Sequence, residues 1–580
     1  MGGPNAGPLL CAQKQPPIKA TREIRAVALT EPKPGVYVYK LAENIAGWVR
    51  FRTSGPAGHR ITLRFNETLA PDGTLSNHLS SHTHGRYQTG ELILAGNGEE
   101  VYEPRFTYHG FQYVQVEGLT RKPALSDLVG VAVHTALEPA AEFACSHEWL
   151  NALHRMCRRT YLNNLHSIPT DCPQREKMGW LADGAVASDM AMWAFDAATF
   201  YTKWTEDLRD AAAPNGSMPA FVPTCGWGEE GQPGHNFADA WWGGATVLVP
   251  WNLYRHYGDT RLLREHYPAM RRYVDYLGTR AQEHLLTTDL GDWLAIDMPP
   301  KEVTATLGYC YFARLVARTA AVLGNTADAE RYDRLAEAIR DAFNARYFDA
   351  EAGRYRFDMQ SALAMALYFG LPPDGHAAAV QRQLVASIEE KGRGQVSTGI
   401  VGTEFLLKAL QAAGRDDVAY RLVTAHGYPG WFHMLASGST TVWEAWHAEG
   451  LSQNHPALAC VDAWLTQVLA GIRLDPETPG FRKVILRPYL AEGLTWVRGS
   501  HRALTGEIAS YWRRDGRRLT WEITLPANTS ATVYVPAPSA AAVTESGRPA
   551  SQAEGVRFLR QEAGAAVFAV GAGRYRFVVR

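Results

Sequence analysis

The stretch Asp328-Ala-Glu-Arg-Tyr-Asp-Arg-Leu-Ala-Glu-Ala-Ile-Arg-Asp-Ala-Phe-Asn-Ala-Arg346 indicates the fold of the largest part of this chain. Its apolar residues recur three and four positions apart, which is the spacing of one face of an α-helix. The same spacing is found in segments 259–277, 308–323, 360–369, 376–390, 402–413 and 457–471. About a dozen paired helices, joined by loops rich in Gly, Pro and Trp, predict an (α/α)6 barrel whose loops gather at one end.

The sequence on either side of the helical region predicts β-structure. Alternating apolar and polar residues, many of them β-branched or aromatic, occupy segments 35–41, 61–66, 113–117, 483–488, 519–524, 531–535 and 573–577. Many short strands separated by turns favour β-sandwiches. We therefore predict a multidomain α and β protein, with an N-terminal β-sandwich at 1–138, a central (α/α)6-barrel domain at 139–475 and a C-terminal β-sandwich at 476–580.

Length, charge and cysteine content exclude several classes of protein. The 580 residues are too many for one hydrophobic core. The formal net charge of −1, with both signs interspersed, argues against nucleic-acid and anionic-membrane partners. The chain as given has neither an export signal nor an apolar run of about 18 residues, so we expect a cytoplasmic protein. Seven cysteines without a CxxC pair argue against structural zinc and a disulfide framework.

The loop Pro169–Asp183 concentrates ionisable side chains. Pro169 and Pro173 interrupt any helix before a new one is expected near Gly179. The loop and the start of that helix contain Asp171, Arg175, Glu176, Lys177, Trp180 and Asp183. Catalytic residues are common on loops held by a rigid scaffold, so this segment is the first candidate site.

A second candidate segment lies far downstream, where Glu444 stands between Trp443 and Trp446. Tryptophans in polar loops, whose faces can stack on sugar rings, occur at 227, 241, 242, 293, 431, 443 and 446. A pair of carboxyl groups can act as acid and base on a glycosidic bond. The two clusters together suggest carbohydrate chemistry.

Eight motifs in order give the chain a resemblance to a known family. They are Glu43–Arg50, Glu103–Phe111, the Asp171–Asp183 loop, Gly291-Asp292-Trp293, Tyr428–Trp431, Thr440–Glu444, Asn454-His455 and Gly480–Pro488. With these motifs the chain resembles glycoside hydrolase family 78, the α-L-rhamnosidases, over almost its whole length. It departs from many members in leaving no room for a further amino-terminal β-domain, and in a shorter loop between Glu444 and Asn454.

The resemblance implies an exo-acting, inverting hydrolase of terminal α-L-rhamnose that needs no cofactor or metal. Its partner is then a rhamnose-containing glycoside or oligosaccharide, and a homodimer is left open. By position in the motifs, Glu176 matches the general acid and Glu444 the general base. The residues that would bind the sugar are Asp171, Arg175, Trp180, Asp183, Trp242, Asp292, Trp293, Trp431, Trp443 and His455.

Structural roles compete with these functional ones. Glu176 and Arg175 could form a surface ion pair, Asp171 an Asx turn, and Asp183 a helix brace. His455 and several of the tryptophans could belong to the core. For the whole chain, the alternatives are another deoxy-sugar or L-sugar glycosidase, a lyase or phosphorolytic enzyme on the same toroid, and a non-catalytic carbohydrate-binding protein. The presence of both Glu176 and Glu444 disfavours the last.

Overall fold

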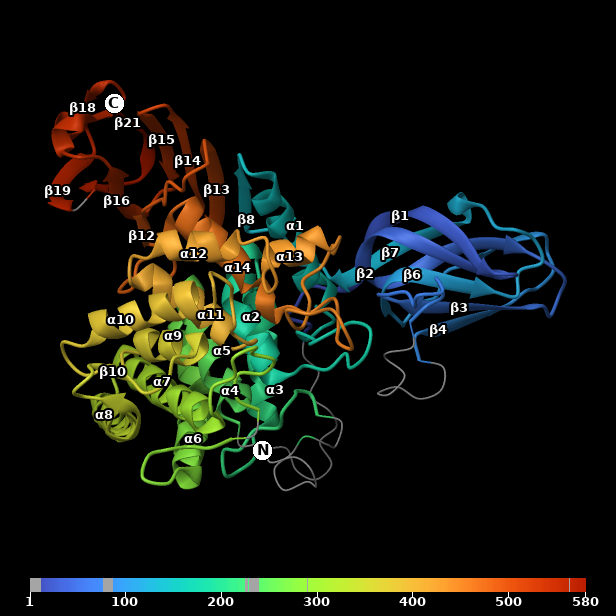
Figure 1. The fold of residues 1–580 in the computed structure, drawn as a ribbon, viewed down its shortest axis with the longest axis horizontal. Coiled ribbons are helices and arrows are strands. Elements are labelled where there is room, and N and C mark those ends of the chain that lie inside the picture. Colours follow the sequence, from blue (N-terminus) through green and yellow to red (C-terminus); the bar gives the residue numbers. More distant parts are fainter. Residues whose placement is uncertain (1–11, 77–86, 225–227, 229–238, 289, 563) are drawn as a thin grey trace.

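The computed structural model describes residues 12–76, 87–224, 228, 239–288, 290–562 and 564–580 (Figure 1). A β-sheet region lies at each end of the chain, and helices occupy the middle. This arrangement confirms the predicted multidomain order of β, helical and β regions.

The N-terminal region is one seven-stranded sheet. Its elements are β1 (Ile18–Lys33), β2 (Val36–Ser54), β3 (Arg60–Asn66), β4 (Thr89–Ile93), β5 (Glu99–Tyr102), β6 (His109–Glu117), the short helix η2 (Leu125–Asp127) and β7 (Leu128–Thr135). The order is β1-β7-β2-β6-β3-β4, with β5 paired to β2. Gly47 of β2 pairs with His109 of β6 on one side and with Ala132 of β7 on the other, and a side chain there would meet the Val131 carbonyl oxygen at 1.9 Å. Glycine is therefore required at this position between the two neighbouring strands.

Helices form the middle of the chain. They are α1 (Glu148–Asn163), α2 (Leu181–Ala194), α3 (Ala198–Ala211), α4 (Ala240–Gly243), α5 (Ala245–Tyr257), α6 (Thr260–Arg280), α7 (Lys301–Val322), α8 (Thr326–Tyr347), α9 (Gln360–Tyr368), α10 (Ala377–Ala386), η3 (Ser387–Lys391), α11 (Gly402–Ala412), α12 (Asp416–Val423), α13 (Trp431–Ala436), η4 (Ala457–Cys460), α14 (Val461–Trp464) and η5 (Leu465–Leu469), with a small hairpin of β9 (Phe348–Asp349) and β10 (Arg354–Tyr355). The stretch from 328 to 346 lies in α8 as predicted, and α8 buries Tyr332, Ala336, Ile339 and Phe343 along one face.

Helix α2 is central to this region. All of its residues except Asp189 are buried, which is the pattern of a helix surrounded by others. The helix begins directly after the loop that contains Glu176. The rigid centre of the helical region therefore positions the first candidate motif.

The C-terminal region consists of two sheets. Its strands are β11 (Ile472–Leu474), β12 (Lys483–Leu486), β13 (Trp496–Ala503), β14 (Gly506–Asp515), β15 (Arg518–Leu525), β16 (Ser530–Pro536), β17 (Val543–Glu545), β18 (Arg548–Pro549), β19 (Val556–Glu562), β20 (Ala565–Val570) and β21 (Gly573–Val579), with short helices η6 (Ala540–Ala542) and η7 (Ala550–Gln552). The orders are β11-β12-β16-β20-β19 and β18-β17-β21-β15-β14-β13-β8. The ring centroids of Phe568 in one sheet and Phe577 in the other lie 5.9 Å apart.

Two strands of these sheets come from within the range predicted for the helical domain. β8 (Ala141–Cys145) pairs with β13, and β11 pairs with β12. The first and last segments of the range 139–475 thus join the helices to the C-terminal sheets.

Side-chain contacts at the end of α1 attach the N-terminal sheet to the helices. Asn163 Oδ1 accepts a hydrogen bond from the Ala46 amide at 3.1 Å, and Arg159 forms an ion pair with Glu43 at 2.7 Å.

In the described part of the chain, no helix is long and apolar enough to cross a membrane. The five cysteines within that part are free and buried, while Cys11 and Cys225 lie outside it.

Candidate active site

The loop from Pro169 to Trp180 is held in shape by its own hydrogen bonds. The Asp171 amide donates to the Met178 carbonyl at 3.0 Å, and the Met178 amide donates to Asp171 Oδ1 at 3.0 Å. Gly179 packs so closely on Val222 that a side chain would meet its carbonyl oxygen at 2.3 Å. The close packing at Gly179 fixes where α2 starts, and so fixes the positions of Glu176 and Asp183.

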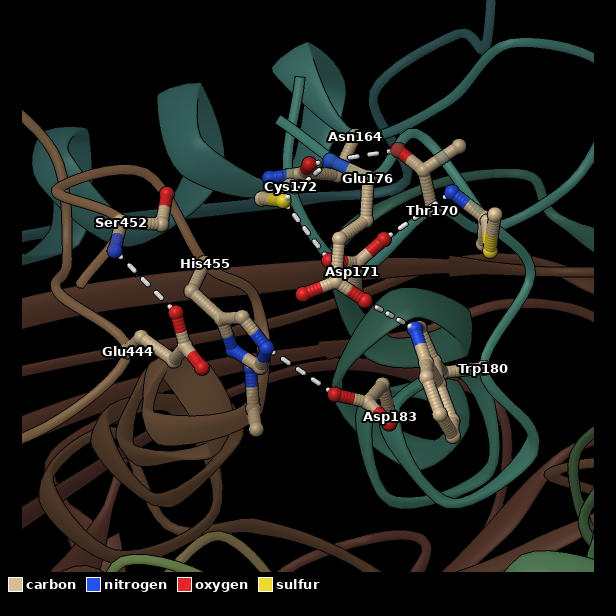
Figure 2. Close-up of polar contacts among 12 residues, drawn as sticks. Asn164, Thr170, Asp171, Cys172, Glu176, Trp180, Asp183, Glu444, Ser452 and His455 are labelled. Atoms are coloured by element: carbon tan, nitrogen blue, oxygen red, sulfur yellow. Dashed lines mark hydrogen bonds and ion pairs between the residues drawn. The ribbon is translucent and has the colours of Figure 1, made fainter. Parts of the chain in front are cut away.

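The second loop, residues 439–455, follows α13 and doubles back on itself. The Glu444 amide donates to the Ser452 carbonyl at 2.9 Å, and the His455 amide donates to the Val442 carbonyl at 2.9 Å. The Ser452 amide donates to Glu444 Oε2 at 3.1 Å. Backbone pairing thus brings Glu444 and His455, eleven positions apart, to the same side of the loop (Figure 2).

Arg175 connects the two loops. Its Nη2 lies 2.8 Å from Glu176 Oε1 and 3.3 Å from Glu444 Oε2, so the two oxygens are separated by no more than the sum of these distances. Although burial opposes the charged form, the neighbouring carboxylates, Glu444 first, raise the pKa of Arg175 further above its ordinary value. A permanently charged guanidinium offsets the two negative charges.

The environments of Glu176 and Glu444 differ. The side chain of Glu176 is 28% exposed, whereas that of Glu444 is 8% exposed. Glu176 Oε2 also accepts a hydrogen bond from Trp180 Nε1 at 2.6 Å. The pair is therefore asymmetric, with one carboxyl closer to solvent and one enclosed.

Asp171, Asp183 and His455 complete the polar side of the site (Figure 2). His455 Nε2 lies 2.9 Å from Asp183 Oδ1. Burial lowers the pKa of His455, but the hydrogen bond and charge of Asp183, together with the charges of Glu444 and Asp171, raise it by more, so the net shift is upward. Burial and the charge of Glu176 raise the pKa of Asp171 well above its usual range. Its Oδ2 accepts from the Cys172 thiol at 2.7 Å.

One cavity of about 260 Å³ brings most of the predicted residues together. It is lined by Asp171, Arg175, Glu176, Trp180, Asp183, Trp242, Leu290, Trp293, Glu444, Gly450, Leu451 and His455. The indole Nε1 of Trp242 is buried and has no hydrogen-bond partner among the described residues. Such a donor is available to a ligand hydroxyl.

Three predicted binding residues do not line this cavity. Asp292 is fully buried and braces the backbone, accepting from the amides of Gly399, Val401 and Gly402 at 2.7–3.1 Å. Trp431 is fully buried, and its Nε1 donates to the Leu458 carbonyl at 2.9 Å. Asp292 and Trp431 do not line the cavity because their side chains point into the core, where they form hydrogen bonds with backbone groups.

Other tryptophans singled out in the sequence also lie outside the lining of the cavity. Trp443 lines a neighbouring groove instead, with its Nε1 bonded to Ser439 Oγ at 2.9 Å. Trp241 and Trp446 are buried and donate to the backbone carbonyls of Thr304 and Thr398. Trp227 lies outside the described residues.

Sequence reasoning missed the apolar lining residues Leu290 and Leu451. Leu290 directly precedes the Gly291-Asp292-Trp293 motif, and Leu451 lies in the loop between Glu444 and Asn454. Their position beside a motif was the only sequence signal for either leucine.

Lys177 points away from the site, since its Nζ donates to the Tyr108 carbonyl of the N-terminal region at 2.7 Å. Burial lowers the pKa of Lys177 to about 8.

Within the described ranges, no group of three or more His, Cys, Asp or Glu side chains is arranged to hold a metal ion. The ionisable groups that line the cavity are carboxyl, imidazole and guanidinium groups, and carboxyl and imidazole groups can donate and accept protons in catalysis.

Family models match three consecutive parts of the chain. The concanavalin-like domain of bacterial alpha-L-rhamnosidase matches residues 30–134, the 6 hairpin glycosidase domain matches residues 138–469, and the C-terminal domain matches residues 471–549. The alpha-L-rhamnosidase of Streptomyces avermitilis is 37% identical over 98% of this chain and 54% of the relative.

Solved structures agree over the same length. The crystal structure of the Streptomyces avermitilis alpha-L-rhamnosidase complexed with L-rhamnose matches with a TM-score of 0.91 over 98% of this chain and 54% of that one, at 37% identity. An alpha-L-rhamnosidase from Dictyoglumus thermophilum matches with a TM-score of 0.90 and 33% identity, over 98% of this chain and 64% of that one. The chain spans 54% of the length of the Streptomyces relative and 58% of that of a relative from Formosa agariphila.

The model of the hairpin glycosidase domain alone accounts for residues 138–469, which is more than half of the chain. Its companion domains cover the sheets on both sides, so the resemblance to glycoside hydrolase family 78 is confirmed. This chain belongs to the bacterial alpha-L-rhamnosidase family.

Proposed function

We propose that this chain hydrolyses terminal, non-reducing α-L-rhamnose from glycosides or oligosaccharides, with inversion at the anomeric carbon. The observation that carries the proposal is the convergence of Glu176 and Glu444 on Arg175 within one cavity. Two carboxyl groups beside one small cavity can act as the acid and the base in the hydrolysis of a glycosidic bond. A relative whose crystal structure is complexed with L-rhamnose supports the choice of sugar.

The difference in exposure supports the proposed roles of the two carboxyl groups. The leaving group departs toward solvent, so the more exposed Glu176 is the acid that protonates the glycosidic oxygen. The enclosed Glu444 is the base that takes a proton from the attacking water. Arg175 keeps both side chains oriented, because its Nη2 contacts both.

The other lining residues suit a 6-deoxy sugar. Asp171, Asp183 and His455 offer polar atoms for ring hydroxyls, and Trp242 Nε1 offers an unused donor. Leucine and tryptophan side chains, from Leu290, Leu451, Trp180 and Trp293, provide an apolar surface for the C5 methyl group. A cavity of about 260 Å³ is below the roughly 300–1,000 Å³ of larger ligand sites, which favours a single sugar ring and exo action.

Inversion and retention require different spacings of the carboxyl groups. An attacking water needs roughly 6.5–9.5 Å between them, and a covalent nucleophile needs about 5–5.5 Å. The Glu176 and Glu444 oxygens that contact Arg175 Nη2 at 2.8 and 3.3 Å lie closer together than the range for an attacking water, so this spacing does not itself support inversion. The resemblance to glycoside hydrolase family 78 is what favours inversion. The configuration of the first product decides between the two.

The proposal extends to the architecture. We propose that the helices form an (α/α)6 barrel, that the single N-terminal sheet folds back on itself into a β-sandwich, and that the two C-terminal sheets form a second β-sandwich, with domains at 1–138, 139–475 and 476–580. Strands β8 and β11 then connect the barrel to the C-terminal domain.

A panel of aryl glycosides that differ only in the sugar tests the substrate. We expect turnover of the α-L-rhamnoside and little or none of α-L-fucoside, β-D-glucoside or β-D-glucuronide, followed by release of rhamnose from flavonoid rhamnosides. Proton NMR of the early reaction should show β-L-rhamnose appearing before mutarotation. No turnover of any rhamnoside would refute the activity, whereas α-L-rhamnose as the first product would refute inversion alone.

A further inference from the structure

A buried glutamate of the N-terminal sheet reaches the loop that carries Glu444. Glu67 directly follows β3 and is 2% exposed. Its Oε1 accepts from Asn44 Nδ2 at 3.0 Å, and its Oε2 accepts from the Gln453 amide at 2.8 Å. One carboxyl group thus joins a side chain of the N-terminal sheet to the backbone of the helical region.

The contacts close into a ring of four residues, two from each region. Thr441 Oγ1 accepts from Asn44 Nδ2 at 3.1 Å and donates to the Gln453 carbonyl at 2.6 Å. Glu67 and Asn44 contribute from the sheet, while Thr441 and Gln453 contribute from the loop. Every member of the ring therefore touches two others, which restricts their relative movement.

The ring holds both ends of the segment that presents Glu444. Thr441 lies three residues before Glu444, and Gln453 follows Ser452, whose amide donates to Glu444 Oε2 at 3.1 Å. A shift of Gln453 would also move the neighbouring Ser452. Among the described residues, the Ser452 amide is the only backbone group that donates a hydrogen bond to the Glu444 carboxylate. A displacement of about 1 Å in a catalytic group can cost about 100-fold in rate.

We propose that Glu67 is a positioning residue for Glu444, so that the N-terminal sheet completes the active site of the helical region. This inference rests on the function proposed above, since it assigns Glu67 a part in the water-activating step. Glu67 is not among the residues that line the proposed sugar cavity.

The position requires an ionised carboxylate. Both partners of Glu67 are N–H donors, so a glutamine or a protonated acid must direct one of its own hydrogens at a donor. Burial raises the pKa of Glu67 to about 7, against the lowering effect of the hydrogen bonds from Asn44 and Gln453. Glu444 raises it further and Arg175 lowers it.

Other ionisable groups line the same groove as Glu67, namely Lys40, Tyr113, Tyr428, His433, His447 and Glu449. As the pH falls through about 7, Glu67 takes up a proton and one hydrogen bond of the ring is lost. The wild-type kcat should therefore decline on the acid side near neutrality, in addition to the decline caused by the catalytic carboxyls.

The Glu67→Gln variant of the full chain tests the proposal. We expect kcat to fall by about 10- to 100-fold on activated aryl and natural rhamnosides alike, because both need the attacking water. KM should change by less than about threefold, since the cavity lining is intact. The acid limb of kcat near pH 7 should disappear.

Glu43→Gln is the matched control. Glu43 joins the same two regions through Arg159 at 2.7 Å but makes no contact with Gln453 or Glu444 among the described residues. The same change of residue type should leave kcat and its pH profile close to the wild-type values. An equal loss in Glu43→Gln would mean that general loosening of the interface, and not Glu67, is responsible, and would overturn the proposal.

Thr441→Val provides a second route if Glu67→Gln does not fold. It removes two bonds of the ring while keeping the shape of the side chain. The same selective loss of kcat is expected. Wild-type kcat and pH profile in either folded variant would overturn the positioning role, whereas a wild-type protein inactive on every rhamnoside would refute the proposed function instead.

Discussion

Replacing Glu176 by glutamine separates proton donation from binding. Glu176→Gln removes the acidic proton but keeps the size of the side chain. General acid catalysis contributes about 10²–10⁴-fold, so natural rhamnosides should lose about 2.7–5.4 kcal/mol of transition-state stabilisation. Rhamnosides with very acidic leaving groups depart without a proton and avoid this loss.

The contacts of Glu176 indicate how much activity the Glu176→Gln variant should lose even on activated substrates. Glu176 Oε1 forms an ion pair with Arg175 Nη2 at 2.8 Å, and Glu176 Oε2 accepts a hydrogen bond from Trp180 Nε1 at 2.6 Å. Because the two carboxylate oxygens face two donors, the glutamine amide must direct its NH2 group at one of them and lose a hydrogen bond. That loss costs about 1 kcal/mol, or roughly fivefold. This fivefold loss is common to both substrate classes, so their losses of activity should still differ by about 10²–10⁴-fold, the contribution of acid catalysis.

The assay compares kcat/KM for 2,4-dinitrophenyl α-L-rhamnoside and for a flavonoid rhamnoside in wild type and Glu176→Gln. Thermal unfolding of both proteins checks that the fold is retained. Equal losses on the two substrates would refute the assignment, because Glu176 would then act only in binding.

Three further substitutions test the remaining assignments. Glu444→Ala should lose at least about 10²-fold on all substrates; azide should restore part of the turnover and give β-rhamnosyl azide by NMR, while an α-configured azide would indicate a covalent intermediate. Trp431→Ala should lower the free energy of unfolding by about 3–5 kcal/mol in urea titrations, since it deletes a buried indole and its bond to Leu458, with KM unchanged in the folded protein; a raised KM at wild-type stability would place Trp431 in the sugar site. Asp183 raises the pKa of His455 above its ordinary value of about 6.5, so the pair stabilises the fold fully below that pH and loses this contribution as the pH rises through the raised pKa. Asp183→Asn should therefore lower the unfolding temperature more at pH 5.5 than at pH 9, and an equal decrease at both would contradict the charged pairing.

Local sequence patterns determined the kind of element that each segment forms. The apolar spacing from 328 to 346 matches α8, because a helix can bury only residues three and four apart. Alternation in 519–524 matches β15 in the same way, with Leu519, Trp521 and Ile523 buried. The clustering of ionisable groups around and after Pro169 and Pro173 also predicted that Glu176 lies on a loop leading into a helix, and the structure places it on the loop before the buried helix α2.

The direction in which a side chain points could not be predicted from the sequence. Asp292 and Asp183 are both acids next to motif residues, yet Asp183 lines the cavity while Asp292 turns to backbone amides more than a hundred positions later in the chain. Trp431 and Trp242 differ in the same respect. Residue type reports polarity, but only packing among distant segments decides which polar groups remain available.

The contacts between the N-terminal sheet and the helical region could not be predicted from the sequence either. Nothing in the residues around Glu67 distinguishes it from a surface glutamate on a strand end, because its partners Asn44 and Gln453 lie 23 and 386 positions away. The sequence by itself determined the order of the three regions, the motifs and the two catalytic candidates. Tertiary structure alone decided that Arg175 joins those candidates and that the N-terminal sheet supports the loop of Glu444, because both depend on long-range packing that no local pattern encodes.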